Sequence, residues 1–363
     1  MRKKLLIVID GCSEKYLSEQ HTPNIMEIAK DGFYTTTHGS IPSVTNVNHA
    51  TIMTGEHPNV HGMTGNYYYH RDTGEHGFIE DSHPLKTETI FDRYHKSGKS
   101  TALLAVKGKV IDVFGRNVRY RINAQRPDSN LLAQLDLKQP PNIDTLEAND
   151  WIFEACHGII AKKDPDLVYC TTNDYMMHNF SPESGEARHY MGIIDDWIGK
   201  IYHLDKSREI YITADHGMNP KTTLINMQNI LSEMGYEVFC LLPLKDRYLE
   251  NHIYQEGGAV YLYVLGDQQD LVDCLKAKPY VDGIYSKEEA GAKFHLPVNS
   301  IGDLLVLAAP QYAFGEFEGS KMSVNSVRTH GSLYEAQIPL ISVNSPKGAN
   351  QYEHSRDIVR FMK

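Results

Sequence analysis

The chain has 363 residues, of which 41% are hydrophobic and 23% are charged, and its formal net charge is -10. This length is ample for one or two domains with a large buried core. The acidic balance argues against a general nucleic-acid binder, which is more often basic. The five cysteines are an odd number without a CxxC pair, which argues against a disulfide framework and against a cysteine zinc site.

The first predicted element is a buried strand in the N-terminal run MRKKLLIVIDG. Residues 5–9 are continuously apolar, as expected for a strand covered on both faces. The run is too short for a signal peptide, and Asp10 interrupts it. No stretch is long enough to span a bilayer. We therefore expect a cytoplasmic protein without a membrane partner.

Strands and helices are then predicted to alternate along the chain. A helix is expected over residues 23–31, with Thr22 as N-cap, Pro23 at its first position and Gly32 after its end. Further buried strands are predicted at 101–106, 166–172 and 209–215, and amphipathic helices at 88–99 and 187–204. This alternation indicates an α/β fold with a mostly parallel central sheet and helices on both faces.

The sequence pattern changes after residue 235, where shorter strands and a helix are predicted to follow one another. We interpret residues 238–322 as a small inserted α+β cap subdomain. The catalytic core would then comprise residues 1–237 and 323–363.

Aspartate and histidine residues recur near the predicted strand ends. Asp10 and Asp215 follow buried strands directly, and ligands of α/β sheets bind beyond the carboxyl ends of strands. Mixed carboxylate and imidazole donors suit zinc, and manganese or iron less specifically. A single aspartate after a strand is also typical of a turn cap, so the metal interpretation depends on the whole set. The candidates are Asp10, Asp174, His178, Asp215, His216 and His330.

Spacing supports two of these pairs. Asp174 and His178 are four residues apart, so on a helical turn they would share a face. Asp215 and His216 are adjacent, so a turn must begin between them if both are to reach one ion. Gly217 makes such a turn plausible.

A hydroxyl nucleophile is available in SIPSVTNVNHATIMTG, where Thr45 precedes a run that can start a helix. A helix N-terminus carries positive potential, and a divalent ion lowers the pKa of a nearby hydroxyl. Taken alone, Thr45 is also a good N-cap residue. A metal site without turnover would not need this hydroxyl.

Together these motifs, in this order, resemble the alkaline phosphatase superfamily. The similarity runs from Asp10 through TNVNHATIMTG, DYMMH and ADHG to THG. Within the superfamily, the residues most resemble the branch that holds type I phosphodiesterases, nucleotide pyrophosphatases and phosphonoacetate hydrolase. The resemblance implies two divalent ions, preferably zinc. It places one ion on Asp174, His178 and His330, and the other on Asp10, Asp215 and His216, with Thr45 bridging as nucleophile and Asn66 bonding a phosphoryl oxygen.

The substrate expectation comes from LLAVKGKVIDVFG, where Lys107 and Lys109 follow a predicted strand. A similar lysine pair holds the substrate carboxylate in phosphonoacetate hydrolase, and paired ammonium groups would stabilise the carbanion that leaves when a C–P bond breaks. A solvated lysine pair on a surface loop is the alternative. We therefore expect a small anionic phosphonate or phosphate ester as substrate, and a homodimer is compatible with the sequence.

Two other functions stay open from the sequence. A nucleotide pyrophosphatase or phosphodiesterase would carry an aromatic residue after the nucleophile, where this chain has Asn46, although the run Tyr67–Tyr69 can supply stacking faces or form a strand. A metal-binding protein without turnover is the more distant alternative, and the presence of Thr45 and Asn66 argues against it.

Overall fold

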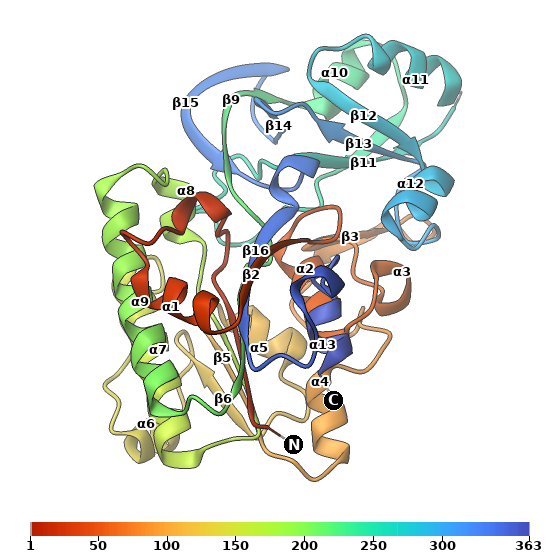
Figure 1. The fold of residues 1–363 in the computed structure, drawn as a ribbon. Coiled ribbons are helices and arrows are strands. Elements are labelled where there is room, and N and C mark those ends of the chain that lie inside the picture. Colours follow the sequence, from red (N-terminus) through yellow and green to blue (C-terminus); the bar gives the residue numbers. More distant parts are fainter. Residues whose placement is uncertain (1, 267, 363) are drawn as a thin grey trace.

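The computed structural model describes residues 2–266 and 268–362, and Figure 1 shows a central sheet flanked by helices. Among these residues, the sheet has seven strands in the order β2-β16-β8-β1-β7-β5-β6. Only β16 runs against the others, since it pairs antiparallel with both β2 and β8. The strands are β1 (Lys4–Val8), β2 (Phe33–His38), β5 (Thr101–Ala105), β6 (Tyr120–Asn123), β7 (Leu167–Thr171), β8 (Glu209–Thr213) and β16 (Gln337–Val343). The predicted mostly parallel sheet is confirmed.

Side chains alternate along each strand and so point to both faces of the sheet. Both faces are buried. Leu5 and Ile7 of β1 join one apolar core, and Leu6 and Val8 join the other. The first face is covered by α1 (Pro23–Asp31), α6 (Ser129–Leu135), α7 (Leu146–Lys163), α8 (Tyr175–Asn179) and α9 (Gly185–Leu204). The second face is covered by α2 (Thr45–Thr54), α4 (Ile90–Lys96), α5 (Gly108–Phe114) and α13 (Asp357–Phe361), with the short α3 (Pro58–His61) beside α2. None of the helices in the described ranges combines the length and apolar character needed to cross a membrane.

The start of α1 shows a long-range contribution that local sequence does not reveal. The helix has the predicted bounds, but the Thr22 side chain makes no capping bond, because its hydroxyl is engaged with the backbone of Ser18. The carboxylate of Asp195 on α9 accepts the N–H groups of Asn24 and Ile25 instead, at 3.0 and 2.8 Å. A buried carboxylate from a neighbouring helix thus replaces the local cap.

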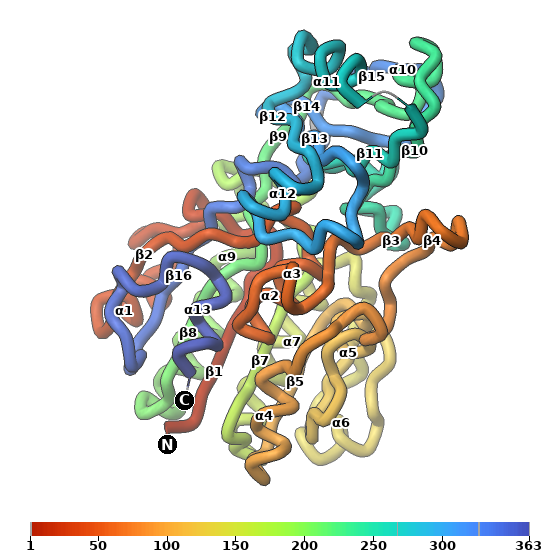
Figure 2. The backbone as a smooth tube through the Cα atoms, turned by 90° about the vertical axis from the view of Figure 1, so that its right-hand side faces the viewer, coloured from red at the N-terminus to blue at the C-terminus, as the bar shows by residue number. Residues whose placement is uncertain are grey.

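A second body of sheets lies beyond the end of the central sheet at which β1 terminates (Figures 1 and 2). Its four-stranded antiparallel sheet has the order β10-β11-β13-β12, and its three-stranded sheet has the order β14-β9-β15. A separate hairpin pairs β3 with β4. These strands are β3 (Tyr67–His70), β4 (Glu75–Phe78), β9 (Asn219–Ile225), β10 (Val238–Leu241), β11 (Ala259–Val264), β12 (Val281–Ser286), β13 (Leu304–Ala308), β14 (Tyr312–Phe314) and β15 (Lys321–Thr329). The remaining helices are α10 (Met227–Glu233), α11 (Gln268–Lys276) and α12 (Lys287–Phe294), with 3-10 turns at Glu14–Tyr16, Leu333–Glu335 and Ala349–Gln351.

The three-stranded sheet joins the two predicted parts of the chain. Strand β9 and most of β15 belong to the predicted core, whereas β14 belongs to the predicted cap. The division at residues 238 and 322 stays a prediction. The run Tyr67–Tyr69 lies in β3 of the hairpin, where Tyr69 packs on Tyr263 with ring centroids 4.8 Å apart.

Candidate active site with two metal-ligand groups

The candidate site is built from the carboxyl ends of four neighbouring strands. Asp215 follows β8, Asp10 follows β1, Asp174 follows β7 and Lys107 follows β5, and these strands lie side by side in the sheet. Parallel strands end at the same edge, so the topology brings these four charged side chains together. Gly11, at φ +76°, turns the chain after Asp10, and a Cβ there would approach the Met177 side chain to 3.1 Å.

The first cluster, called the Asp174 group, contains the predicted residues Asp174, His178 and His330, and it also contains His252. One donor atom from each of the four lies within 4.8 Å of the others, and all four residues are buried. Asp174 is the N-cap residue of α8, and its Oδ2 lies 3.3 Å from His178 Nε2. The predicted shared face of the DxxxH pair is therefore present.

The second cluster, called the Asp10 group, contains Asp10, Asp215 and His216, also with donor atoms within 4.8 Å of one another. His216 Nε2 lies 3.4 Å from Asp10 Oδ1 and 3.3 Å from Asp215 Oδ2. The chain turns as expected between the two adjacent residues, since the His216 N–H donates to Asp215 Oδ1 at 3.0 Å. The hydroxyl of Thr45 lies 3.3 Å from His216 Nε2.

Three imidazoles are oriented by backbone carbonyls. Nδ1 of His178 lies 2.7 Å from the Arg328 carbonyl oxygen, Nδ1 of His330 lies 2.7 Å from that of Ser43, and Nδ1 of His216 lies 3.0 Å from that of Gly217. A carbonyl oxygen only accepts hydrogen bonds, so each Nδ1 carries a proton, and Nε2 is the ring nitrogen left to bind a metal. This is the arrangement by which outer contacts orient histidine ligands toward a metal.

The two groups adjoin one another. The rings of His216 and His330 stack with centroids 3.5 Å apart and planes inclined by 10°. The Lys107 ammonium lies 2.6 Å from Asp174 Oδ1 and 3.6 Å from Asp10 Oδ2, and therefore contacts a carboxylate of each group. The site is a single buried centre with two sets of donors.

The electrostatics of the centre fit divalent cations. Burial raises the pKa of Asp215 to about 7, with Asp174 adding to the effect, and burial also raises the pKa of Asp10 well above its usual value, with Asp174 and Asp215 adding. Burial opposes ionisation of Asp174 too, but Lys107 and His178 outweigh it and hold that pKa well below the usual range.

Buried polar atoms without a hydrogen-bond partner also indicate a site for divalent cations. Six buried side-chain atoms of the two groups have no hydrogen-bond partner among the described residues: Asp10 Oδ1, Asp215 Oδ2, Asp174 Oδ2, His178 Nε2, His330 Nε2 and His252 Nδ1. Each is a lone-pair donor of the kind that zinc and related ions accept. An unsatisfied buried polar atom costs about 1–3 kcal/mol, so a cation shared among these atoms would relieve a substantial penalty.

Thr45 stands at the first position of α2, with Val44 rather than Thr45 as the N-cap residue. Its hydroxyl therefore does not cap the helix and faces His216 instead. The side chain is buried, and the helix N-terminus adds positive potential at this point. The arrangement suits a hydroxyl that loses its proton and attacks an electrophile.

The predicted substrate-binding residues are buried and already partnered. Lys107 and Lys109 are 3% and 2% exposed, so the surface-loop alternative is wrong for both. The Lys109 ammonium pairs with the carboxylate of Asp246. The Asn66 amide donates to Asp246 Oδ2 and to the Leu244 carbonyl, each at 3.3 Å, while its oxygen accepts the Asn46 N–H at 3.0 Å.

Sequence reasoning did not identify the contribution of residues 242–258, here called the β10–β11 connection. Its Asp246 forms an ion pair with Lys109, and its Asn251 amide donates to Asp174 Oδ1 at 3.1 Å. Its His252 belongs to the Asp174 group. The ring of Tyr248 lies within 6 Å of both lysine ammonium groups, at 5.8 and 5.7 Å. No spacing or periodicity in NHIYQEGG marks these residues in advance.

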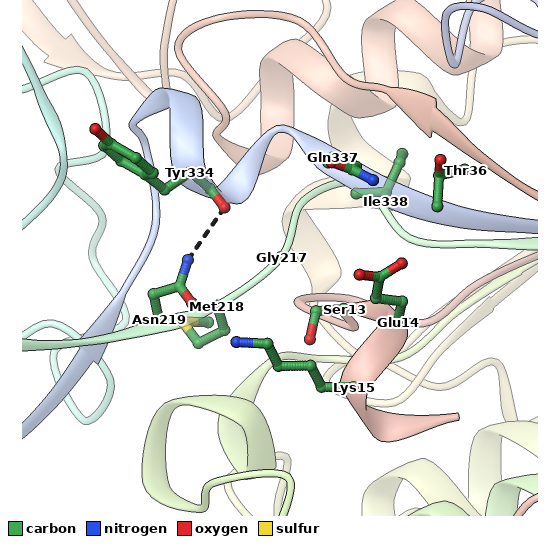
Figure 3. Close-up of a pocket in the computed structure, with 10 residues that line it drawn as sticks. All are labelled: Ser13, Glu14, Lys15, Thr36, Gly217, Met218, Asn219, Tyr334, Gln337 and Ile338. Atoms are coloured by element: carbon green, nitrogen blue, oxygen red, sulfur yellow. Dashed lines mark hydrogen bonds between the residues drawn. The ribbon is translucent and has the colours of Figure 1, made fainter. Parts of the chain in front are cut away.

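Figure 3 shows a separate pocket. Its ten lining residues include Ser13, Lys15, Gly217, Met218 and Tyr334. None of its ten lining residues belongs to the two ligand groups or carries the candidate nucleophile. We therefore do not assign the chemistry to it.

Comparison with known proteins gives a consistent family signal. The family model for type I phosphodiesterase / nucleotide pyrophosphatase matches residues 4–333. Human ectonucleotide pyrophosphatase/phosphodiesterase family member 7 is 26% identical over 318 residues, which cover 82% of this chain and 64% of the relative. An uncharacterized pyrophosphatase/phosphodiesterase of Schizosaccharomyces pombe is 26% identical over 233 residues, which cover 60% of this chain and 44% of the relative. The chain thus spans less than two thirds of either relative's length.

Among solved structures, phosphonoacetate hydrolase from Sinorhizobium meliloti superimposes with a TM-score of 0.89. The match is 26% identical and covers 99% of this chain and 94% of that one. The hydrolase was crystallised with phosphonoformate and with phosphonoacetate. The predicted alkaline phosphatase-like fold is confirmed by this similarity.

Proposed function

Because the chain belongs to the type I phosphodiesterase / nucleotide pyrophosphatase family, we propose that it is a two-metal hydrolase with Thr45 as its nucleophile. The observation that carries this proposal is the hydroxyl of Thr45 beside His216, next to two buried groups of Asp and His donors. Asp174, His178 and His330 would hold one ion, and Asp10, Asp215, His216 and Thr45 the other. We propose zinc for both positions, with manganese or iron as alternatives, because the donors mix carboxylates and imidazoles.

The ions would supply positive charge for the phosphoryl oxygens and lower the pKa of the attacking hydroxyl. Thr45 Oγ1 would pass its proton to solvent and attack phosphorus, the leaving group would depart with the bonding electron pair and take up a proton, and a phosphoryl group would remain on Thr45. Water would then attack the same phosphorus and release the threonine hydroxyl. Asn66 would orient a non-bridging oxygen with its amide, as the resemblance implies.

For the substrate, we propose phosphonoacetate or a related carboxylated phosphonate, whose C–P bond is cleaved. Two buried lysines support this, one in contact with Asp10 and Asp174 and the other with Asp246, since a carboxylate needs cations besides the metals. The structural similarity to a phosphonoacetate hydrolase along nearly the whole chain supports it further. Ammonium groups held against the carboxylate would stabilise the carbanion leaving group as an enolate-like form.

The second candidate is hydrolysis of nucleotide pyrophosphates or phosphodiesters, which the names of the curated relatives favour. Asn46 cannot replace the stacking aromatic, because it is fully buried and donates to the Ile79 carbonyl at 3.2 Å. An aromatic ring that lies close to both lysines is that of Tyr248. A metal-binding protein without turnover is the remaining alternative.

Three other parts of the proposal concern the whole protein. We propose a core of residues 1–237 and 323–363 with a cap of residues 238–322; an apolar core around the four-stranded sheet supports a second unit there, and Ile225, Met227 and Leu231 also contribute to it. A cytoplasmic location is proposed on the free state of all five cysteines. A homodimer remains compatible with these features.

The decisive experiment is a substrate panel with metal analysis. Purified protein, loaded with zinc or manganese, is assayed on phosphonoacetate, a p-nitrophenyl phosphodiester and a nucleotide pyrophosphate, and compared with Thr45→Ala. We expect phosphonoacetate to be preferred, and Thr45→Ala to keep two ions per chain while losing turnover by several orders of magnitude. Preference for the nucleotide would favour the second candidate. Near-normal turnover of Thr45→Ala would show that water attacks directly, and inactivity on every substrate with both ions bound would favour a binding protein.

A further inference from the structure

His252 lies in the β10–β11 connection, far in sequence from the predicted ligands. We propose that it supplies a fourth donor, its Nδ1, to the ion held by the Asp174 group. This inference rests on the proposed two-metal centre. One ring nitrogen of His252 lies within 4.8 Å of a donor atom from each of Asp174, His178 and His330.

The environment of His252 is that of a ligand rather than of a satisfied core histidine. The residue is 2% exposed, and its Nδ1 is buried without a hydrogen-bond partner in the ranges that the structure describes. Its ring meets that of His178 edge to face, with centroids 4.5 Å apart, and lies 6.0 Å from that of His330. Both neighbouring rings also present an unpartnered nitrogen. Since each such atom costs about 1–3 kcal/mol when buried unsatisfied, a shared cation explains all three.

The backbone around His252 is held in place by a compact turn. The His252 N–H donates to the Leu249 carbonyl at 3.1 Å, and its own carbonyl accepts the Gln255 N–H at 2.9 Å. The Gln255 amide also donates to the carbonyls of His252 and Asp246, at 3.1 and 2.8 Å, and its oxygen accepts the Asp246 N–H at 2.7 Å. The imidazole is therefore presented from a pre-formed loop.

This donor set has two chemical consequences. One carboxylate and three neutral imidazoles leave a divalent ion with a net charge of +1, which favours an anionic substrate. The set is also one donor larger than the three-residue sets of most catalytic zinc sites. Because Gln255 joins the turn of His252 to the backbone of Asp246, a metal held by His252 would also fix the carboxylate that faces Lys109 and Asn66.

The test uses metal binding as its readout. Full-length protein is stripped with a chelator, and zinc is titrated back in competition with a chromophoric chelator. Cobalt(II) is added in parallel, because its visible absorption reports the number and geometry of ligands. We expect two zinc ions per wild-type chain. His252→Ala should lower the affinity of one of them by at least ~10-fold, the smaller effect expected even of outer-shell contacts, and should change the cobalt spectrum.

Three further variants separate the outcomes. His252→Asp restores a donor and should recover part of the affinity, which a loss of packing alone would not produce. His189→Ala, at an exposed position of α9, should behave as wild type. Unchanged zinc affinity and an unchanged cobalt spectrum in His252→Ala, with affinity lost in Asp174→Ala, would refute the role of His252 and leave the two-metal centre standing. Unchanged binding in both variants would refute the centre itself.

Discussion

The ammonium group of Lys109 is paired with the carboxylate of Asp246, and both side chains are almost completely buried, at 3% and 4% exposure. The same carboxylate oxygen accepts from the Asn66 amide. Two of the groups predicted to bind a substrate therefore converge on a carboxylate that belongs to the chain. On the proposed function, Asp246 lies against Lys109 where the carboxylate of an anionic substrate would bind.

Replacing Asp246 by Asn is expected to destabilise the ligand-free protein and to strengthen its response to carboxylated ligands. Breaking a buried ion pair by removing one partner costs about 3–5 kcal/mol, because the remaining charge is uncompensated. A ligand carboxylate would restore that compensation at Lys109, whereas phosphate has no carboxylate to do so. The measurement is the rise in Tm with phosphonoacetate and with phosphate.

The control for this experiment is Glu316→Gln, which makes the same charge change in the Lys245–Glu316 pair, whose side chains are 23% and 51% exposed. It should leave Tm and both ligand responses nearly unchanged, since exposed pairs contribute about 0–1 kcal/mol. A Tm response of Asp246→Asn to phosphonoacetate that is no larger than that of wild type would contradict the assigned role of Asp246.

The two lysines are expected to differ when each is changed to Met. Lys107 touches Asp174 and Asp10 directly, so Lys107→Met should lower kcat on every substrate. Lys109 contacts Asp246 and neither ligand group, so Lys109→Met should act only on carboxylated substrates. Loss of a charged hydrogen bond of about 1.5–3 kcal/mol corresponds to roughly a 10- to 100-fold rise in KM. Steady-state kinetics on phosphonoacetate and a p-nitrophenyl phosphodiester measure this, and equal losses for both variants on both substrates would argue against the distinction.

Much of the centre could be predicted because several of its residues belong to recognisable local sequence patterns. A five-residue apolar run that ends in Asp10 signals a buried strand with a carboxylate at its end, and the same pattern recurs at Asp215. The four-residue spacing of Asp174 and His178 signals one helical face. The order of these patterns along the chain was sufficient for the family and the fold.

The remaining features of the centre depend on tertiary contacts that produce no local sequence pattern. His252 and Asp246 reach the site because the second body of sheets folds back over the ends of the central strands (Figure 2), and no periodicity encodes that approach. Asp195 caps α1 from α9 for the same reason. The resemblance to phosphonoacetate hydrolase singles out Lys107 and Lys109, but their burial and their carboxylate partners follow only from the tertiary packing.

Removal of divalent ions should lower the stability of the protein substantially. Without cations, the carboxylates of Asp10, Asp174 and Asp215 share one buried centre, where burial raises the pKa of Asp10 and Asp215. A ligand present at 1,000 times its Kd stabilises the folded state by about 4 kcal/mol. We expect Tm to fall on chelation and to recover with zinc or manganese but not with sodium. An identical Tm with and without chelator would contradict the presence of an ion centre.

His61 is expected to make the protein acid-sensitive. The Met63 N–H donates to its Nδ1 at 3.1 Å, so this nitrogen is an unprotonated acceptor, and Nε2 lies 3.0 Å from the Thr51 hydroxyl. Burial lowers the pKa of His61 from 6.5 to about 3. Between pH 6.5 and pH 3, the unfolded chain therefore binds a proton at this residue that the folded chain does not bind. The free energy of unfolding falls as the pH falls through this range. From pH 6.5, where the unfolded imidazole is half protonated, to pH 5 the loss amounts to about 1.6 kcal/mol. Urea unfolding at several pH values measures this loss. His61→Gln should flatten the pH dependence of the free energy of unfolding by about this amount. His189→Gln, at an exposed position, is the control and should retain the wild-type slope. A wild-type slope in His61→Gln would show that this imidazole is not held neutral in the folded protein.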